Sequence, residues 1–259
     1  MESKSARLKR RLREGGPAFG MFCCLPTYQT VEVIASAGFD FLVFDVEHAP
    51  SGPGAVHAQL AVLARCPTAA VVRIAAHDPV AIKHYLDLGA DALMVPNVDT
   101  AEQAEQIVRF MRYPPAGVRG FGGSMRASDY FRDGGYYRRA NDEMWLMAQI
   151  ESPRALENLD SIVAVGGVDA VFFGPSDFAA QSGLIGQPAH PSIVAAMEAG
   201  MRRARAAGKV AGILCGETQV ERYRAAGAQI IAVGSEVGLL VRGADDLVKR
   251  LNAGPGVPG

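Results

Sequence analysis

The chain has 259 residues, and 49% of them are hydrophobic, so it carries enough apolar material for a large core. Its 26 basic and 27 acidic side chains nearly balance, which argues against a nucleic-acid or membrane-surface partner, because both favour a basic face. The length suits either two ordinary domains or one α/β barrel.

The amino-terminal residues and the cysteines predict a cytoplasmic protein. Residues 1–16 are highly charged and lack the apolar segment of a signal peptide. No window of the chain reaches the roughly 18 apolar residues that a membrane span needs. We expect reduced thiols, with a thiol nucleophile or a zinc site as the alternative, because no C-x-x-C pair occurs among Cys23, Cys24, Cys66 and Cys215.

Apolar segments rich in β-branched residues alternate with helical patterns along the chain. The strands are expected at Ala18–Cys24, Phe39–Asp45, Ala70–Ile74, Ala92–Val95, Trp145–Ile150, Ala170–Phe173, Val210–Leu214 and Ile230–Val233. The helices that follow them are expected at Tyr28–Ala37, Pro53–Ala64, Asp78–Leu88, Thr100–Met111, Pro153–Leu159, Ser192–Ala207, Thr218–Ala226 and Ala244–Asn252.

This alternation predicts a closed (β/α)8 TIM barrel that forms a single domain over residues 1–259. The predicted strands are almost continuously apolar, which is typical of a parallel sheet covered on both faces. An open doubly wound sheet is the alternative, but it usually carries a glycine-rich phosphate loop after its first strand, and residues 23–26 contain none. Residues 112–143 form an unusually long connection, which predicts an active-site or interface loop.

Barrel enzymes place their chemistry at the carboxyl ends of the strands, and two acids follow neighbouring strands there. Glu151 follows the fifth predicted strand and Asp177 follows the sixth. Carboxylate oxygens suit hard divalent ions such as Mg²⁺ or Mn²⁺. Each acid could instead cap a following helix. As a pair on adjacent strands, they favour a metal site.

Two further side chains at these strand ends suit proton transfer and charge stabilisation. His48 has an ordinary pKa close to working pH, and Asp45 or Asp87 could orient its ring and raise its basicity. Arg73 ends a strand, where its planar fork suits a carboxylate or an oxyanion. A structural histidine and a buried ion pair are the respective alternatives.

Lysine is missing from the carboxyl ends of the predicted strands. A Schiff-base mechanism requires a lysine in the pocket, so carbanion chemistry at this site would need a metal ion as its electron sink.

Several ordered segments carry a family resemblance: AGFDFLVFDVEHAP, VVRIAAHDPVAIKHYLDLGADALMVPNVDTAEQA, RYPPAGVRGFGG, AQIESPRALENL and GVDAVFFGPSDFAAQSG. From Gly20 to about Leu251 the chain resembles the class II pyruvate aldolases of the hydroxy-oxo-acid aldolase family, within the aldolase/citrate lyase superfamily. The resemblance implies a barrel of the phosphoenolpyruvate/pyruvate type. It also implies a homohexamer, built as a trimer of dimers, whose final helix is exchanged between subunits.

The resemblance implies a role for each matching residue. His48 corresponds to the general base, Asp87 to a carboxylate that raises its basicity with Asp45 beside it, and Arg73 to the group that stabilises the enolate. Glu151 and Asp177 correspond to the metal ligands, for Mg²⁺ or Mn²⁺ with Co²⁺ also possible. The groups around bound pyruvate correspond to Gln149, Ser176 and the backbone of Asp177.

The implied reaction is reversible cleavage of a 4-hydroxy-2-oxo acid to pyruvate and an aldehyde through an enolate held by the metal, as in the catabolism of aromatic or sugar acids. Two other enzymes are alternatives, an oxaloacetate decarboxylase and an acyl-CoA lyase of the citrate lyase type. A third alternative is a barrel that binds a ligand without catalysing a reaction. Ser176 stands where the best-known member has Ala, and the segments LPTYQT and CGETQV also differ. The aldehyde therefore does not carry over.

Overall fold

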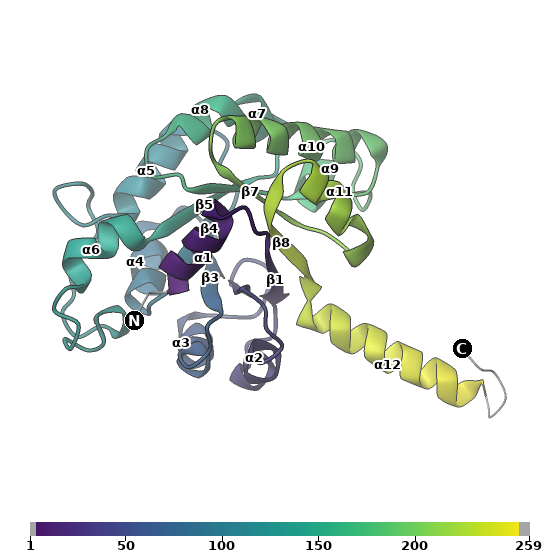
Figure 1. Cartoon of the computed structure of the whole chain (residues 1–259), viewed down its shortest axis with the longest axis horizontal. Coiled ribbons are helices and arrows are strands. Elements are labelled where there is room, and N and C mark those ends of the chain that lie inside the picture. The colour runs from purple at the N-terminus through teal and green to yellow at the C-terminus, as the bar shows by residue number, and fades with distance from the viewer. Residues whose placement is uncertain (1–3, 254–259) are drawn as a thin grey trace.

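The computed structural model describes residues 4–253, in which the strands close into a barrel (Figure 1). Neighbouring strands are all parallel, and the first strand also pairs with the last. This closure confirms the predicted (β/α)8 barrel and excludes the open sheet. The strands are β1 (Ala18–Cys23), β2 (Phe41–Asp45), β3 (Ala69–Arg73), β4 (Ala92–Val95), β5 (Trp145–Ile150), β6 (Ala170–Phe173), β7 (Val210–Leu214) and β8 (Ala228–Ser235).

Helices cover the outside of this barrel (Figure 1). Seven of them follow the expected positions, with shifts at their ends: α2 (Tyr28–Ala35), α3 (Pro53–Leu63), α4 (Pro79–Asp87), α5 (Ala101–Met111), α7 (Pro153–Glu157), α10 (Pro191–Ala206) and α11 (Val220–Ala225). The remaining elements are new or much longer than expected: α1 (Lys4–Arg13), η1 (Arg126–Ser128), α6 (Tyr136–Glu143), α8 (Leu159–Ala164), α9 (Pro175–Gln181), η2 (Glu217–Gln219) and α12 (Glu236–Asn252). Short or strongly charged helices such as these give weak apolar periodicity.

Two separate apolar layers hold the barrel together. The larger layer lies between the strands and the surrounding helices, and the smaller one fills the barrel interior. Gly20 shows how tightly the interior is packed, because a Cβ at this position would lie 2.4 Å from the Phe41 ring. Only glycine therefore fits on β1 beside that aromatic side chain.

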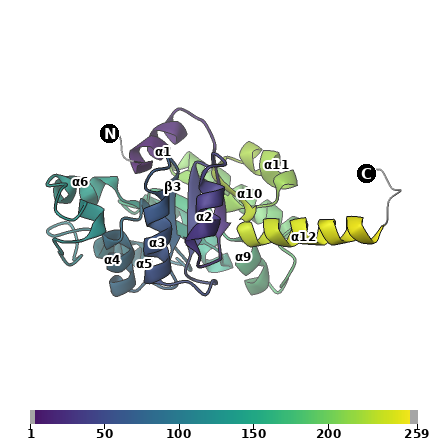
Figure 2. The same cartoon turned by 90° about the horizontal axis from the view of Figure 1, so that it is seen from below.

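The amino-terminal helix α1 closes one end of the barrel. Its Leu8 and Leu12 side chains are buried in the interior layer together with Trp145 at the start of β5. Lys9 lies over the Trp145 ring, with its Nζ 5.4 Å from the ring centroid. Figure 2 shows α1 on one side of the barrel, away from α9. The opposite end, where the strands finish, stays open for the site.

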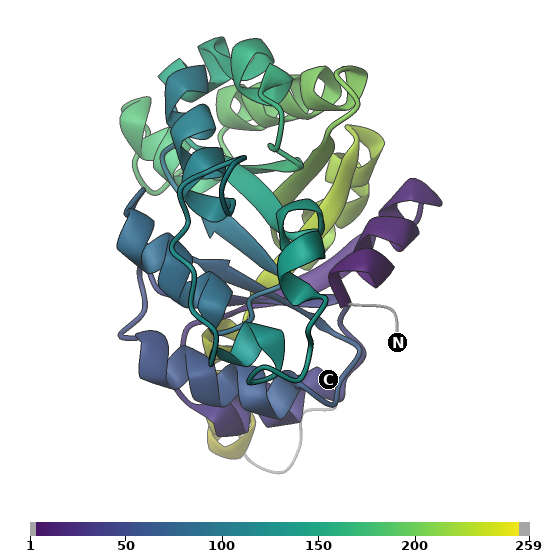
Figure 3. The same ribbon diagram turned by 90° about the vertical axis from the view of Figure 1, so that its left-hand side faces the viewer.

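The long segment 112–143 lies along the outside of the barrel, and its last residues reach α1 (Figure 3). It contains η1 and α6, and the backbone carbonyl of Glu143 accepts a hydrogen bond from Ser5 of α1. The Arg126 guanidinium donates to the carbonyls of Leu60 and Leu88. Within one chain this segment therefore lies away from the carboxyl ends of the strands.

The last helix, α12, projects away from the barrel (Figures 1 and 2). It begins at Glu236 rather than at the expected Ala244, and Ser235 caps it by accepting a hydrogen bond from the Gly238 N–H. Its apolar side chains are largely exposed, including Leu239, Leu240, Val241, Leu247, Val248 and Leu251.

Within residues 4–253, none of the helices combines the length and the apolar character that crossing a bilayer requires.

Substituting Leu12 tests the role of α1. Leu12 is only 4% exposed, so we expect Leu12→Ala to lower the free energy of unfolding by about 2–5 kcal/mol through a cavity in the interior layer. Arg7→Ala, at an exposed position of the same helix, is the control and should change it by less than about 0.5 kcal/mol. Denaturant titration measures both. Equal stability of Leu12→Ala and the wild type would show that α1 does not close the core.

Candidate active site

A cavity of about 430 Å³ opens where the strands of the barrel end. Its lining combines aromatic and apolar side chains with a few polar groups, which is the usual composition of a small-molecule site. The predicted site residues among its lining are His48, Arg73, Gln149, Ser176 and Asp177.

Arg73 and Asp45 form a buried ion pair at the ends of β3 and β2. The guanidinium donates from Nε to Oδ1 at 3.0 Å and from Nη2 to Oδ2 at 2.7 Å. Burial opposes the charge of Arg73, but the Asp45 hydrogen bonds and the charges of Asp45, Glu47 and Glu151 outweigh it and raise the pKa of Arg73. The guanidinium also lies 4.9 Å from the centre of the Phe22 ring. Arg73 is thus both an ion-pair partner and a cation lining the cavity.

His48 lies on the turn after β2, with its side chain 61% exposed at the cavity. Its Nε2 is 3.6 Å from Oε2 of Glu47, and that oxygen is 3.3 Å from Nη1 of Arg73. Asp45 contacts the backbone of this turn rather than the imidazole, because its Oδ1 accepts from the N–H groups of Glu47 and His48. The acid beside the His48 ring is therefore Glu47.

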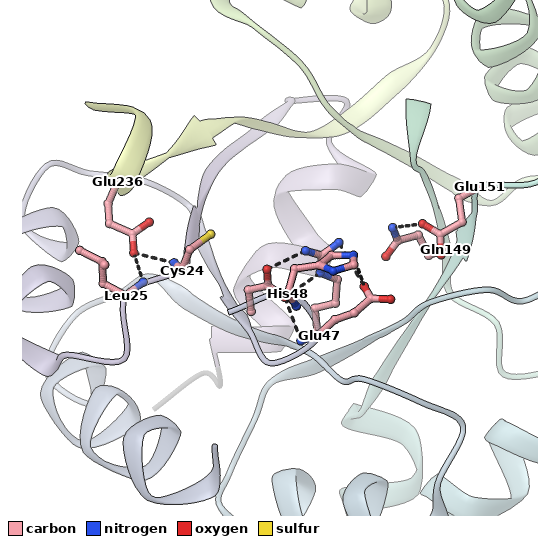
Figure 4. A network of polar contacts seen from close by, with 9 residues as sticks. Cys24, Leu25, Glu47, His48, Gln149, Glu151 and Glu236 are labelled. Carbon is pink, nitrogen blue, oxygen red and sulfur yellow. Dashed lines mark hydrogen bonds and ion pairs between the residues drawn. The ribbon is translucent and has the colours of Figure 1, made fainter. Parts of the chain in front are cut away.

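Glu151 is buried beyond the end of β5 and points toward the neighbouring strands. Its Oε1 accepts from the Asn97 N–H at 2.7 Å, and its Oε2 accepts from Nε2 of Gln149. Figure 4 shows this pair and the Glu47–His48 pair, which come from different strands. The pKa of Glu151 is raised to about 7, chiefly by burial and also by the charges of Glu47 and Asp177, against the opposing effects of the Asn97 N–H and Arg73.

Neither metal candidate caps a helix. The N-cap of α7 is Ser152, and the N-cap of α9 is Gly174, so Asp177 lies inside the first turn of α9. A Cβ at Gly174 would lie 2.7 Å from Oε2 of Glu151, so glycine leaves room for this carboxylate. The capping alternative is therefore rejected for both Glu151 and Asp177.

Asp87 lies far from His48 along the barrel axis. It is the last residue of α4, and this helix runs back from the end of β3 to the start of β4. Its carboxylate accepts from Nη2 of Arg119 at 2.6 Å. Within one chain, the structure therefore brings Asp45, Arg73 and His48 together but leaves Asp87 at the other end of the barrel.

The sequence analysis assigned no role to two acids at the strand ends that shape this site. Glu47 immediately precedes His48, and burial raises its pKa despite the nearby charge of Arg73. Glu236 is buried at the start of α12, where its Oε1 accepts from the N–H groups of Cys24 and Leu25 at 2.5 and 2.6 Å (Figure 4). Their positions after β2 and β8 were a usable signal, because both follow strands that end at the cavity.

The donor set suits a divalent cation that substrate and water also coordinate. Glu47, Glu151 and Asp177 concentrate negative charge here, and Arg73, which pairs with Asp45 and also lies 3.3 Å from Glu47, balances only part of it. No cluster of three or more His, Cys, Asp or Glu ligands for a metal occurs within residues 4–253. Two carboxylates are nevertheless enough for Mg²⁺, which usually keeps several waters and binds through one or two carboxylates.

Comparisons with known proteins identify the family of the chain. The chain matches the HpcH/HpaI aldolase/citrate lyase family over residues 18–243. It is 44% identical to the 4-hydroxy-2-oxo-heptane-1,7-dioate aldolase of Salmonella arizonae over 247 residues, covering 95% of this chain and 94% of the relative. It is also 44% identical to the hydroxypyruvate/pyruvate aldolase of Pseudomonas aeruginosa over 254 residues, covering 97% and 95%.

A solved structure shares the fold closely. It is that of an HpcH/HpaI aldolase/citrate lyase family protein from Burkholderia cenocepacia, with a TM-score of 0.91 and 35% identity. The alignment covers 95% of this chain and 99% of that one. The chain therefore belongs to the HpcH/HpaI aldolase/citrate lyase family.

Proposed function

We propose that this protein is a divalent-metal-dependent aldolase that reversibly cleaves a 4-hydroxy-2-oxo acid to pyruvate and an aldehyde. Two relatives that align along nearly the whole chain are named as aldolases, which supports the reaction class. The observation that carries the proposal is the gathering of His48, Arg73 and Asp177 at one cavity, with Glu151 buried beside it.

The cation would be held by Glu151 and Asp177, and Mg²⁺ or Mn²⁺ fits these oxygen ligands. When bound, it supplies positive charge that polarises the 2-oxo group of the substrate. Gln149 and Ser176 line the same cavity, and the buried Oε1 of Gln149 has no hydrogen-bond partner within residues 4–253. This oxygen can accept a hydrogen bond from a substrate hydroxyl.

In cleavage, His48 takes the proton of the C4 hydroxyl and the C3–C4 bond breaks. The C4 fragment leaves as the aldehyde, and the bonding electrons become those of the pyruvate enolate. Arg73 stabilises the negative charge that develops on the enolate oxygen, and Asp45 fixes the orientation of its guanidinium. The protonated His48 then delivers a proton to C3, which yields pyruvate and restores the base, and in the reverse direction His48 removes a proton from the methyl group of pyruvate. The exposed position of His48 gives its ring access to solvent for proton exchange.

Proton exchange into pyruvate tests the base. In D₂O with Mn²⁺, the wild-type protein should exchange the methyl protons of pyruvate, and EDTA should abolish this exchange. We expect His48→Ala to slow it by about 100-fold or more, because general bases contribute about 10²–10⁴ in rate. The affinity for Mn²⁺ should stay unchanged. NMR of the methyl group measures the exchange.

His57→Ala is the matched control, because His57 is an exposed histidine on α3. It should exchange at the wild-type rate. Wild-type exchange by His48→Ala would remove His48 as the base. Failure of the wild type to exchange with any divalent ion would favour a binding role or thioester chemistry.

A panel of substrates separates the enzymatic alternatives. Pyruvate release from 4-hydroxy-2-oxo acids supports the aldolase, whereas CO₂ release from oxaloacetate alone supports a decarboxylase. Cleavage of acyl-CoA thioesters alone would support a lyase of the citrate lyase type.

Asp45→Asn tests the buried ion pair. Losing the carboxylate leaves the buried guanidinium of Arg73 without its main partner, so we expect the free energy of unfolding to fall by about 3 kcal/mol. The kcat for pyruvate release should fall by about 100-fold, because Arg73 is no longer held toward the substrate. Denaturant titration and steady-state assays measure these effects.

The exposed pair of Arg224 and Glu221 supplies a comparison for stability. Glu221 is 81% exposed, so Glu221→Gln should cost less than about 1 kcal/mol and leave kcat unchanged. Equal stabilities of Asp45→Asn and Glu221→Gln would mean that the buried pair does not organise the site.

We also propose that the chain assembles as a homohexamer, a trimer of dimers, through exchange of α12. This helix projects from its own barrel and exposes apolar side chains that a second copy could cover. In the same assembly, Asp87 could reach His48 only from another copy. The segment 112–143 would serve as an interface, since Phe121 and Phe131 on it are 71% and 66% exposed.

A charge on α12 tests this assembly. We expect the double substitution Leu240→Glu and Leu247→Glu to dissociate the hexamer, because burying two new carboxylates is costly. Light scattering after size exclusion measures the mass, and Asp245→Asn at an exposed position of the same helix should leave it unchanged. A monomeric wild type would refute the proposal.

A further inference from the structure

One peptide group joins a histidine of the β3–α4 turn to the buried carboxylate of Glu151. The Pro96 carbonyl is 2.6 Å from Nε2 of His77, and the Asn97 N–H donates to Oε1 of Glu151 at 2.7 Å. The carbonyl of Pro96 and the N–H of Asn97 belong to the same amide. This amide therefore has hydrogen bonds on both sides, one to His77 and one to Glu151.

The chemistry of the carbonyl fixes the direction of the first contact. A carbonyl oxygen can only accept, so Nε2 of His77 must carry the proton that it donates. His77 is half-buried and directly precedes Asp78, the N-cap of α4, whose carboxylate accepts from two backbone N–H groups of that helix. The imidazole is thus held at the start of a helix rather than on a free loop.

The backbone at Asn97 has an uncommon conformation. Its φ of 54° lies in the left-handed region, which asparagine tolerates better than most residues. The next residue, Val98, donates its N–H to the Gln149 carbonyl of β5 at 3.3 Å. The turn after β4 is therefore held by β5 on one side and by His77 on the other.

We infer that His77 is a positioning residue that holds the Glu151 carboxylate through the Pro96–Asn97 amide. Hydrogen bonds on both sides of an amide polarise each other, so donation by His77 strengthens the donor that faces Glu151. Gln149 holds the second oxygen of Glu151, which leaves the whole carboxylate oriented by two donors. Without His77 the amide loses one of its two anchors, and Glu151 loses a fixed partner.

The functional consequence rests on the proposed metal site. Partners that orient a metal ligand typically change metal affinity by about 10–100-fold when they are lost. His77 acts through one intervening amide, so we expect His77→Ala to raise the Kd for Mn²⁺ alone by about tenfold, the lower end of that range. In His77→Gln, the side-chain N–H can still donate to Pro96, and the Kd should return most of the way to the wild-type value.

Two measurements separate positioning from a merely structural role. Electron paramagnetic resonance titration gives the Kd for Mn²⁺. Hydrogen–deuterium exchange of the Asn97 amide, resolved by mass spectrometry in the metal-free protein, reports the contact itself. We expect faster exchange in His77→Ala, with His77→Gln close to the wild type. His57→Ala, on an exposed face of α3, should change neither quantity.

The outcomes distinguish this inference from the proposed function. Normal Mn²⁺ binding by His77→Ala, or equal weakening in the alanine and glutamine variants, would overturn the positioning role and leave the aldolase proposal intact. Absence of Mn²⁺ binding by the wild type would overturn the metal site and this inference together. Weaker binding in His77→Ala, with a wild type that binds Mn²⁺ but releases no pyruvate, would support the inference and sink the proposed reaction.

Discussion

The bidentate ion pair between Arg73 and Asp45 is the constraint on which the open end of the barrel depends. The two residues are register partners on neighbouring strands, so the parallel pairing of β2 with β3 itself brings them together. The same carboxylate of Asp45 accepts the backbone N–H groups that shape the turn carrying Glu47 and His48. One buried acid therefore fixes both the cation and the candidate base, which explains why this pair is worth its desolvation cost.

The carboxylates that remain beside this ion pair make the site suitable for a cation. Glu47, Glu151 and Asp177 act on one another, and the pKa of Glu151 rises to about 7 because of burial first and these like charges next. A cation between the carboxylates would reverse that effect, since an opposite charge favours the ionised form. The raised pKa and the proposed metal-binding role would thus have the same cause, namely carboxylate charge that Arg73 balances only in part.

The sequence predicted the barrel and the identity of most side chains at its mouth, because both follow from local patterns. Apolar segments locate the strands, and polar residues at their carboxyl ends point to Glu151 and Asp177. Contacts between elements were less predictable. Nothing local indicates that Asp87 binds Arg119, or that the Asn97 N–H reaches Glu151, because a backbone donor carries no side-chain signal. Helix α1 was missed because its charged composition hides Leu8 and Leu12.

Within one chain, the acid that lies beside His48 is Glu47 rather than Asp87. Asp87 forms an ion pair with Arg119 at the opposite end of the barrel. It could therefore act on His48 only from a second copy of the chain. Glu47 lies 3.6 Å from Nε2 of His48 within the same turn. Within a single chain, Glu47 is therefore the carboxylate placed to orient the imidazole of His48. The same Glu47 oxygen lies 3.3 Å from Nη1 of Arg73. The proposed base and the proposed enolate-stabilising cation therefore share one carboxylate oxygen, and a substrate that bound Arg73 would compete with Glu47 for that guanidinium.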